Sequence, residues 1–333
     1  MNTTVVVTGA GAGVGRAAAR AFAERGCDLG LVARDAERLE AVAEEIRAQG
    51  RRSCPVPTDV SDPDAVEAAA EQVERELGPI DVWVNDAMVT IFAPVQAISP
   101  AEFRRATEVT YLGTVYGTMA ALRRMRPRAR GSIVQVGSAL SYRAIPLQSA
   151  YCGAKFAIRG FTDSVRCELL HDGLPINICM VQLPAINTPQ FDWALSRMPR
   201  RAQPVPPIYE PEVAARAIVF AAFSRRREIW LGGSSWKAIV ANAVAPGLLD
   251  RMLARDGYAS QMRDEAEPPD APANLFKPVR GSQGAHGSFG DRARTGSWTL
   301  PATRHRGVLV AGGLAILGAL GAGLLPNGRR SRS

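Results

Sequence analysis

The sequence contains few of the residues that hold metals or disulfides together. There are five cysteines and three histidines in 333 residues, and the cysteines form neither a CxxC pair nor the spacing of a zinc site. This composition argues against a disulfide framework and a structural metal. Two of the histidines, His286 and His305, lie in the C-terminal part of the chain. We therefore expect no multi-histidine metal centre and no histidine-based catalytic triad.

Lysine is equally scarce. Only Lys155, Lys237 and Lys277 are lysines among the 40 basic residues, so the other 37 are arginines, and the net charge is +8. The arginines are scattered and form no basic stripe with interleaved aromatic residues, so nucleic acid is not an expected partner. Apolar residues make up 47% of the chain and charged residues 22%, which excludes a disordered or fibrous protein.

Short β-branched runs alternate along the chain with longer amphipathic stretches. The expected strands are Val5–Thr8, Asp28–Ala33, the neighbourhood of Val56, Ile80–Val84, Ser132–Gly137, Ile176–Gln182 and Glu228–Leu231. The expected helices are Arg16–Arg25, Ala36–Gln49, Asp64–Leu77, Ala101–Met125, Tyr151–His171 and Pro211–Phe223, with a further amphipathic stretch at Trp236–Arg255. Such alternation predicts an α/β fold: a Rossmann-like, doubly wound parallel sheet between two helical layers. We assign it to a single domain, residues 1–255.

The composition changes beyond this domain. Residues 256–306 are rich in proline and glycine and are expected to be a linker or a loosely packed extension. Residues 307–325 contain no charged side chain and, as a helix, would measure about 28 Å, close to the thickness of a bilayer core. We expect a membrane span there rather than a buried C-terminal helix, followed by a basic tail at 326–333. No signal peptide begins the chain, so the domain is expected in the cytoplasm.

A glycine-rich turn follows the first expected strand. Thr8–Gly15 reads TGAGAGVG and leads directly into the first expected helix. Glycines at such a turn let the backbone approach a pyrophosphate, whose charge is met by the helix N-terminus. The spacing is Gly-x3-Gly-x-Gly, at Gly9, Gly13 and Gly15, instead of GxGxxG. In the order strand, turn, helix, this segment predicts a dinucleotide site, although a merely structural turn is the alternative.

The end of the second expected strand indicates which dinucleotide binds. Arg34 stands where an acidic residue would hold the ribose 2′-hydroxyl of NAD, and its planar fork suits a 2′-phosphate. NADP is therefore favoured over NAD. The neighbouring Asp35 is a candidate N-cap of the next helix. The alternative is that Arg34 is one more surface arginine.

Three residues form a candidate catalytic group. Tyr151 and Lys155 are four residues apart in an expected helix, so both lie on one helical face. A nearby ammonium group lowers the pKa of a phenol from about 10 toward the range useful for proton transfer. Ser138 ends an expected strand, at the sheet edge where open α/β sheets bind ligands, and its hydroxyl could hold a substrate carbonyl.

These residues resemble the classical short-chain dehydrogenases/reductases over about residues 3–235. The resemblance rests on the glycine turn, Asp59-Val60, Asn85-Asp86-Ala87, Ser138, and Tyr151-x3-Lys155. It implies that Tyr151 is the general acid/base, that Lys155 lowers its pKa and binds the nicotinamide ribose, and that Ser138 orients the carbonyl. It also implies a homo-oligomer built on the two long helices. The candidate coenzyme contacts are Gly9, Gly11, Gly13, Val14, Gly15, Arg34, Asp59, Val60, Asn85, Tyr151, Lys155 and Thr188.

The chain departs from the family pattern near these residues. Met88 replaces the glycine of Asn-Asn-Ala-Gly, and Thr110 replaces the asparagine that holds a relay water, so Thr110 is a candidate catalytic residue with a shorter reach. Gly137 replaces a common serine, and Ala185 a common glycine. Two hypotheses follow. The first is an NADP(H)-dependent enzyme that interconverts a carbonyl and a secondary alcohol; the second is a catalytically impaired, membrane-tethered NADP sensor or scaffold. Residues 186–210 are apolar enough to line a pocket for a lipophilic substrate.

Overall fold

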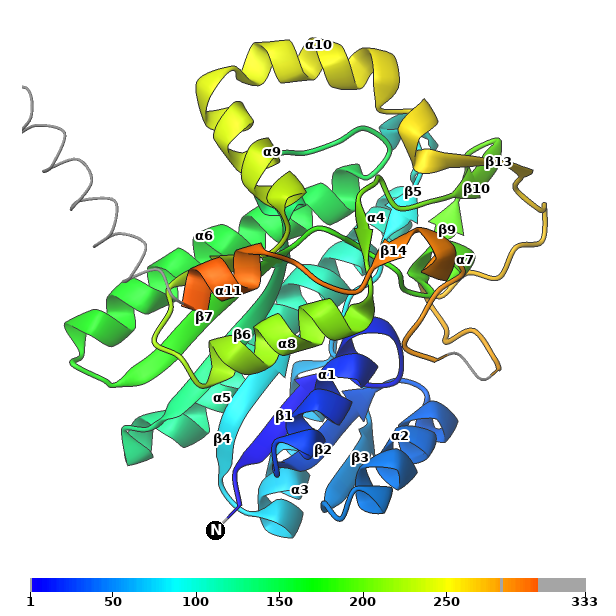
Figure 1. The fold of residues 1–333 in the computed structure, drawn as a ribbon. Helices are drawn as coiled ribbons and strands as arrows, with labels where there is room; N and C mark the ends of the chain where they lie inside the picture. The colour runs from blue at the N-terminus through cyan, green and yellow to red at the C-terminus, as the bar shows by residue number, and fades with distance from the viewer. Residues whose placement is uncertain (1, 282–283, 305–333) are drawn as a thin grey trace, which may run out of the picture.

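The computed structural model describes residues 2–281 and 284–304 and has a seven-stranded sheet at its centre (Figure 1). All the strands of this sheet run parallel, in the order β12-β7-β6-β4-β1-β2-β3. Their bounds are β1 Thr4–Thr8, β2 Asp28–Ala33, β3 Ser53–Pro57, β4 Ile80–Asn85, β6 Gly131–Ser138, β7 Ile176–Leu183 and β12 Glu228–Trp230. The order reverses direction between β1 and β4, as expected of the doubly wound fold, so the predicted Rossmann-like architecture is confirmed.

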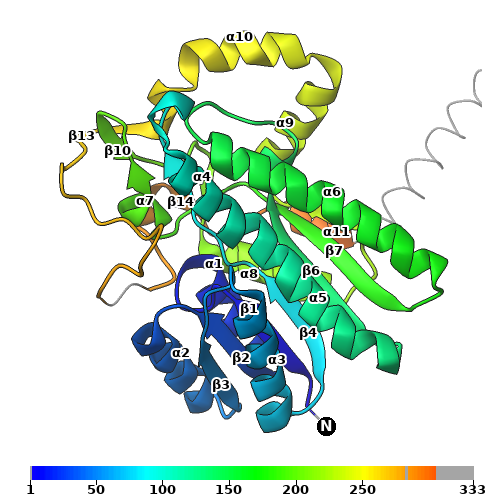
Figure 2. The ribbon, with the colours of Figure 1, turned by 180° about the vertical axis from the view of Figure 1, so that it is seen from behind.

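Helices cover both faces of the sheet (Figures 1 and 2). The helices of one face are α1 Gly13–Glu24, α2 Ala36–Ala48 and α8 Pro211–Ala222; those of the other are α3 Pro63–Leu77, α5 Gly113–Met125 and α6 Ser149–His171. Along β1, Val5 and Val7 pack into the first core, whereas Val6 packs into the second. This alternation arises because successive side chains of a strand point to opposite faces. Both faces of the sheet are therefore buried.

The expected helix Ala101–Met125 is interrupted. It consists of α4 Pro100–Thr107, a π-helical turn at Glu108–Leu112, and α5. At the turn the Thr110 hydroxyl bonds to the backbone of Val89, donating to its carbonyl at 3.0 Å and accepting from its N–H at 3.1 Å. A π-turn of this kind commonly marks a functional site. Amphipathic periodicity does not reveal such a turn, because it displaces the pattern by only one residue.

The expected stretch Trp236–Arg255 is also divided. It forms α9 Gly233–Val244 and α10 Pro246–Asp256, which together arch above the sheet (Figure 1). The break lies at Pro246, whose ring removes a backbone donor and which is tolerated only in the first turn of a helix. None of the α10 residues is buried, and Val244 and Leu248 are 80% and 67% exposed. We call α9 and α10 the helical arm.

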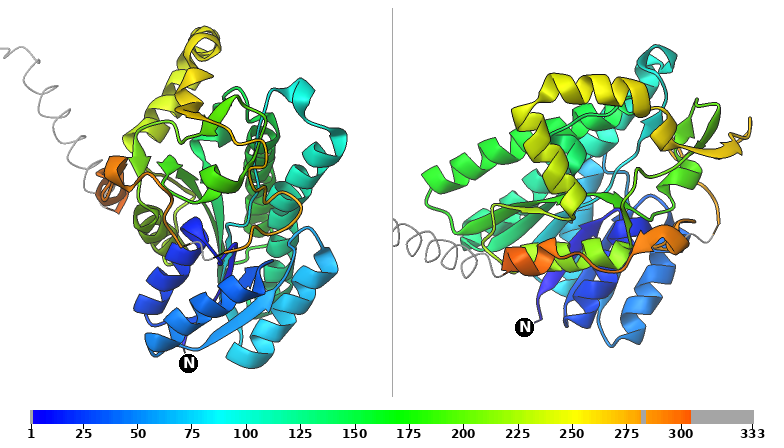
Figure 3. Two further views of the ribbon diagram at one scale, coloured as in Figure 1. Left: turned by 90° about the vertical axis from the view of Figure 1, so that its right-hand side faces the viewer. Right: turned by 45° about the horizontal axis from the view of Figure 1, so that its top comes forward.

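The extension beyond residue 255 packs against the domain instead of hanging free as a linker (Figure 3). Its segments are β13 Met262–Ala266, β14 Ala293–Arg294 and α11 Thr299–Arg304. They meet a set of short elements between β4 and α8, namely β5 Ile91–Phe92, β8 Ala185–Ile186, α7 Gln190–Trp193, β9 Leu195–Ser196, β10 Arg200–Ala202 and β11 Ile208–Tyr209. β13 pairs with β10, and β14 pairs with β11. Buried apolar side chains, Leu275, Ala285, Phe289 and Leu300, explain why this proline-rich stretch is held in place.

The two C-terminal predictions, a membrane span at 307–325 and a basic tail at 326–333, concern residues outside the part of the chain that the structure describes. Within residues 2–281 and 284–304, no helix combines the length and the apolar character needed to cross a bilayer.

Candidate active site

A cavity of about 380 Å³ opens at the carboxyl ends of the strands. Its wall contains the turn between β1 and α1, the end of β6 and the first turns of α6. These elements bring Ser138, Tyr151 and Lys155 to the same cavity as Gly9 and Gly13. The predicted catalytic group and the predicted dinucleotide turn, which are more than 120 residues apart in sequence, therefore share one site.

The glycines of the turn are required by its geometry. Gly9 and Gly13 have φ angles of +73° and +57°, in a backbone region that residues other than glycine rarely adopt. A Cβ on Gly15 would lie 2.3 Å from the carbonyl oxygen of Gly9, so α1 approaches the turn only because this side chain is absent. Val14 lines the cavity at the N-terminus of α1, where backbone N–H groups favour an anion.

Tyr151 and Lys155 project from the start of α6. The Lys155 Nζ atom lies 5.5 Å from the centre of the Tyr151 ring and donates to the carbonyl of Val136 at 2.6 Å. Burial raises the pKa of Tyr151 above its usual value, while a hydrogen bond with Ser138 opposes that rise. Burial also lowers the pKa of Lys155, which is only 4% exposed. The ammonium group is thus held close to the phenol with little water around it.

Asp86 is a site residue that sequence reasoning missed. It follows β4 and lines the same cavity, and it accepts a hydrogen bond from the N–H of Gly15. Burial raises the pKa of Asp86, whereas the charge of Lys155 lowers it; in turn, Asp86 raises the pKa of Lys155. The signal was present in the sequence, because the family pattern has asparagine at this position and only its neighbour Met88 drew attention.

Ser138 ends β6 and begins the short turn that follows it. Its Oγ accepts from the N–H of Leu140 at 3.1 Å, and its own N–H donates to Ser141 Oγ at 3.3 Å. These bonds fix the side chain at the cavity wall and leave its hydroxyl proton for another acceptor. The preceding Gly137 is explained by packing, since a Cβ there would lie 2.4 Å from Gln182 Oε1.

A second, smaller cavity of about 130 Å³ adjoins the first beside the ends of β2 and β3. Gly11, Arg34, Asp59 and Val60 line it, as does Arg38, which the sequence analysis did not single out. The Arg38 guanidinium lies over the Trp193 ring, with its Cζ atom 4.9 Å from the ring centre. One Arg38 nitrogen, Nη2, is buried without a hydrogen-bond partner among the described residues.

The charged residues of the second cavity are already engaged. Arg34 Nη2 donates to the carbonyl of Asn274 at 2.5 Å, and Nη1 to that of Leu275 at 3.3 Å. Asp59 forms a short ion pair with Arg105. Desolvation favours a higher pKa for Asp59, but hydrogen bonds from Arg105 and Ser61 outweigh it. The pKa of Asp59 therefore lies below its usual value. Asp59 is therefore held as a carboxylate beside two arginines.

The remaining predicted residues occupy different positions. Thr188 lines the larger cavity next to Gly13. Asn85 and Thr110 are absent from the walls of both cavities. The Asn85 amide instead donates to Thr118 and Gln135 and accepts from Trp83, at 2.9–3.1 Å. Because the single Thr110 proton is bonded to Val89, a water at this position would have to act as the donor.

Comparison with known proteins identifies the family. Residues 3–197 match the short chain dehydrogenase family. The chain belongs to the short-chain dehydrogenase family. It is 32% identical over 276 residues to an uncharacterized oxidoreductase of Bacillus subtilis, YxnA, in an alignment that covers 82% of this chain and 77% of that protein. The chain is accordingly an oxidoreductase by family.

Solved structures of short-chain dehydrogenases share its fold. An alcohol dehydrogenase of the archaeon Thermococcus sibiricus, complexed with 5-hydroxy-NADP, is 27% identical with a TM-score of 0.61, covering 69% of this chain and 96% of that chain. A metagenomic short-chain oxidoreductase in complex with NADP is 28% identical with a TM-score of 0.57 and the same coverage of each chain. Both matches leave nearly a third of this chain without a counterpart.

Proposed function

We propose that this short-chain dehydrogenase interconverts a carbonyl and a secondary alcohol with NADP(H) as coenzyme. The observation that carries the proposal is the convergence of Ser138, Tyr151 and Lys155 with the glycine turn on one cavity. Similarity to two structures that contain NADP or a derivative of it supports the choice of coenzyme. When bound, the nicotinamide supplies or accepts the hydride.

The residues of the cavity suit the handling of a proton and a carbonyl oxygen. Tyr151 donates the phenolic proton to the forming alkoxide during reduction and recovers it during oxidation. The Lys155 ammonium stabilises the phenolate that this transfer leaves behind. Ser138 donates a hydrogen bond to the same substrate oxygen, since its hydroxyl proton is not used within the turn. Thr110 acts at a distance from the substrate by holding the backbone of Val89, a residue that lines the second cavity.

The charged groups of the dinucleotide match polar and charged groups of the protein in the two cavities. Val14 and the N-terminus of α1 suit the pyrophosphate, while Lys155 suits the nicotinamide ribose. Arg34 and Arg38 line the second cavity, and Arg38 Nη2 is a buried donor with no acceptor in the part of the chain that the structure describes. The two acidic residues there, Asp35 and Asp59, form ion pairs with Arg38 and Arg105. This balance favours a coenzyme that carries a 2′-phosphate over one that carries a hydroxyl.

The substrate end of the larger cavity supports an apolar, uncharged substrate. Beyond Tyr151 its wall is formed by Ile145, Phe191, Trp193, Val205, Ala238 and Leu253, together with neutral polar groups such as Gln148 and Gln261. Asp86 and Lys155 are the charged residues among the described residues of this wall, and the charge of each acts on the pKa of the other. An anionic substrate would meet no free cation at the substrate end, within the described residues.

We also propose that the protein is tethered to a membrane by residues 307–325, with the catalytic domain in the cytoplasm. The uncharged sequence of that run supports the tether. So do the exposed apolar side chains Trp236, Val244 and Leu248 of the helical arm, whose inner side lines the substrate cavity. A homo-oligomer is proposed on the surface of α5 and α6, where Met119 and Phe156 are exposed.

Replacement of the phenol tests the proposed enzyme. In the Tyr151→Phe variant, NADPH-dependent reduction of a panel of apolar ketones and aldehydes should fall by about 10²–10⁴-fold, the usual contribution of a general acid. NADPH binding should persist. The matched control is Tyr111→Phe, because Tyr111 packs on Phe161 away from the cavity. If the wild-type protein binds NADPH but reduces none of the compounds, the sensor or scaffold hypothesis replaces the enzyme.

A further inference from the structure

The extension crosses the smaller cavity as a strap. We define the strap as residues 274–281 and 284–287, which lie beyond the segment that matches the family. Asn274, Pro278 and Val279 form part of the cavity wall, opposite the glycine turn and the end of β2. In Figure 1 the strap descends on the side of the molecule that carries α2 before the chain returns toward α8. The dinucleotide site thus has a wall made by the C-terminal part of the chain.

Leu275 anchors the start of the strap. Its side chain is 1% exposed and belongs to the same hydrophobic core as α3 and α5. Its carbonyl accepts from Arg34 Nη1 at 3.3 Å and from Arg105 Nε at 3.1 Å. Arg105 in turn pairs with Asp59. One buried strap residue therefore connects Arg34, the candidate 2′-phosphate contact, through Arg105 with Asp59, another candidate coenzyme contact.

Asn274 links the strap to α7, whose last residue, Trp193, lines the larger cavity. Its N–H donates to the carbonyl of Trp193 at 2.9 Å, and its side-chain oxygen accepts from Trp193 Nε1 at 3.1 Å once the amide is oriented to satisfy both of its groups. Its carbonyl accepts from Arg34 at 2.5 Å. Further along, the carbonyl of Gly281 accepts from Arg38 Nε at 3.1 Å. Both arginines of the smaller cavity are therefore bonded to strap carbonyls.

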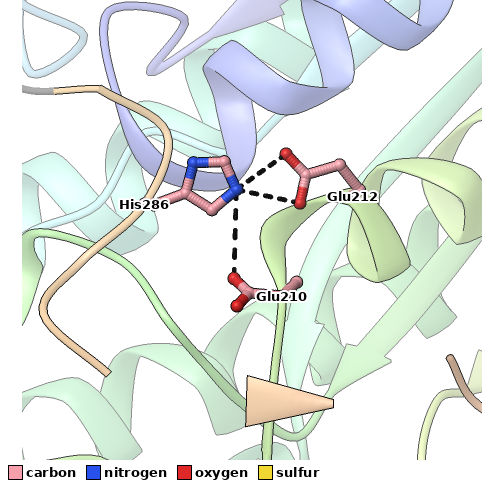
Figure 4. Close-up of side chains that lie close together, drawn as sticks. All are labelled: Glu210, Glu212 and His286. Atoms are coloured by element: carbon pink, nitrogen blue, oxygen red, sulfur yellow. Dashed lines mark hydrogen bonds and ion pairs between the residues drawn. The ribbon is translucent and has the colours of Figure 1, made fainter. Parts of the chain in front are cut away.

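The far end of the strap is fixed beside the glycine turn. Gly284 accepts from the N–H of Gly13 at 3.2 Å. His286 Nε2 lies 3.0 Å from a Glu212 oxygen and 3.9 Å from a Glu210 oxygen, so both carboxylates approach the same ring nitrogen (Figure 4). The N–H of Gly287 donates to the carbonyl of Asn187 at 3.2 Å. The strap is thus attached at both ends, on either side of the dinucleotide turn.

We infer that Asn274 and Leu275 are positioning residues that set the preference for a 2′-phosphorylated coenzyme. This inference rests on the proposed function. A guanidinium has five N–H donors in a rigid fork, and the two strap carbonyls take one donor from each terminal nitrogen of Arg34. The fork is thereby held in one orientation, with further donors free for a phosphate. An arginine that is already ordered loses less side-chain entropy when it binds, so the strap strengthens binding of the 2′-phosphate.

The test is the ratio of the NADH and NADPH dissociation constants in strap variants of the full chain. Leu275→Ala removes the buried anchor and should lower this ratio about tenfold or more by weakening NADPH binding, because a freed arginine loses its preorganisation. The KM for NADPH should rise while kcat at saturating NADPH stays close to that of the wild type. Leu275→Met, which keeps the volume of the side chain, should restore the ratio. Phe276→Ala is the control, because that neighbouring side chain is 56% exposed.

The outcomes separate the inference from the function on which it rests. A folded Leu275→Ala protein with an unchanged ratio overturns the role of the strap while leaving the NADP-dependent enzyme intact. If that variant does not fold, Leu275→Val supplies the same comparison with a smaller loss of core volume. A wild-type protein that binds neither coenzyme, or prefers NADH, contradicts the proposed function itself. An equal loss with Phe276→Ala would show a general effect of the segment and would also overturn the inference.

Discussion

At the scale of single residues, the electrostatic interaction between Asp86 and Lys155 distinguishes this site. The family pattern has a neutral asparagine where this chain has Asp86, whose pKa burial raises to about 7, so above that pH a negative charge acts on the lysine proposed to assist the phenol. Burial lowers the pKa of Lys155, and the charge of Asp86 opposes that change. The carboxylate thus keeps the ammonium protonated to a higher pH than burial alone would allow. In the proposed mechanism, retention of the ammonium matters because only the charged form would stabilise the Tyr151 phenolate.

The expected consequence of Asp86→Asn is a narrower pH range of activity. Loss of the carboxylate lowers the pKa of Lys155, so the alkaline limb of the kcat/KM profile should move to lower pH by about one unit or more. The profile is measured with saturating coenzyme and a fixed ketone. Asp81→Asn, at the opposite end of the same strand, is the control, since Asp81 pairs with the exposed Arg130. An unchanged alkaline limb would show that Asp86 does not act on Lys155.

The sequence predicted which residues line the site better than it predicted which groups those residues bond to. Ser138, Tyr151, Lys155, Gly13 and Thr188 were identified from motifs and do line one cavity. Motifs describe what short segments share, and they contain no information about which distant group faces a side chain. For that reason the bonds from Arg34 to strap carbonyls, and from Thr110 to Val89, could be found only in the structure.

At the scale of the elements, strands and helices were predicted well where periodicity is strong. All seven strands of the sheet were expected, because runs such as Asp28–Ala33 are buried on both faces. The short elements between β7 and α8 were not, since two- and three-residue strands such as β8 carry no periodic pattern. For a related reason the sequence left residues 256–306 open between a linker and a loosely packed extension: isolated anchors such as Leu275 have no neighbours that mark them as buried.

Packing between β6 and β7 explains a departure from the family pattern and gives a prediction for stability. The Gln182 amide fills the space beside Gly137, and a Cβ at that glycine would also lie 2.7 Å from Met180 Cε. Gly137→Val, whose branched side chain brings no hydroxyl group to the buried Gln182 Oε1, should therefore destabilise the protein by about 1–3 kcal/mol through overpacking. Urea unfolding measures the change. Gly160→Val on α6, where no other described residue lies within 4 Å of the added Cβ, is the control. Equal stability of Gly137→Val and wild type would contradict this explanation.

At the scale of the whole molecule, the substrate cavity lies beneath the helical arm, and the arm presents apolar side chains outward. This arrangement suits an enzyme that takes an apolar substrate at a lipid surface. We expect the full chain to sediment with membranes and to resist extraction by high salt, whereas a chain ending at residue 304 should remain in the supernatant. If the two forms fractionate alike, residues 307–325 do not provide the proposed tether.

Coenzyme binding tests the central proposal most directly. The full chain is titrated with NADPH and with NADH, and energy transfer from tryptophan to the nicotinamide is recorded. Trp193 lines both cavities, so a bound coenzyme should quench its emission. We expect both coenzymes to bind, with a dissociation constant for NADPH at least about tenfold below that for NADH, since arginines favour the 2′-phosphate. A folded protein that binds neither, or that binds NADH more tightly, would contradict the proposal.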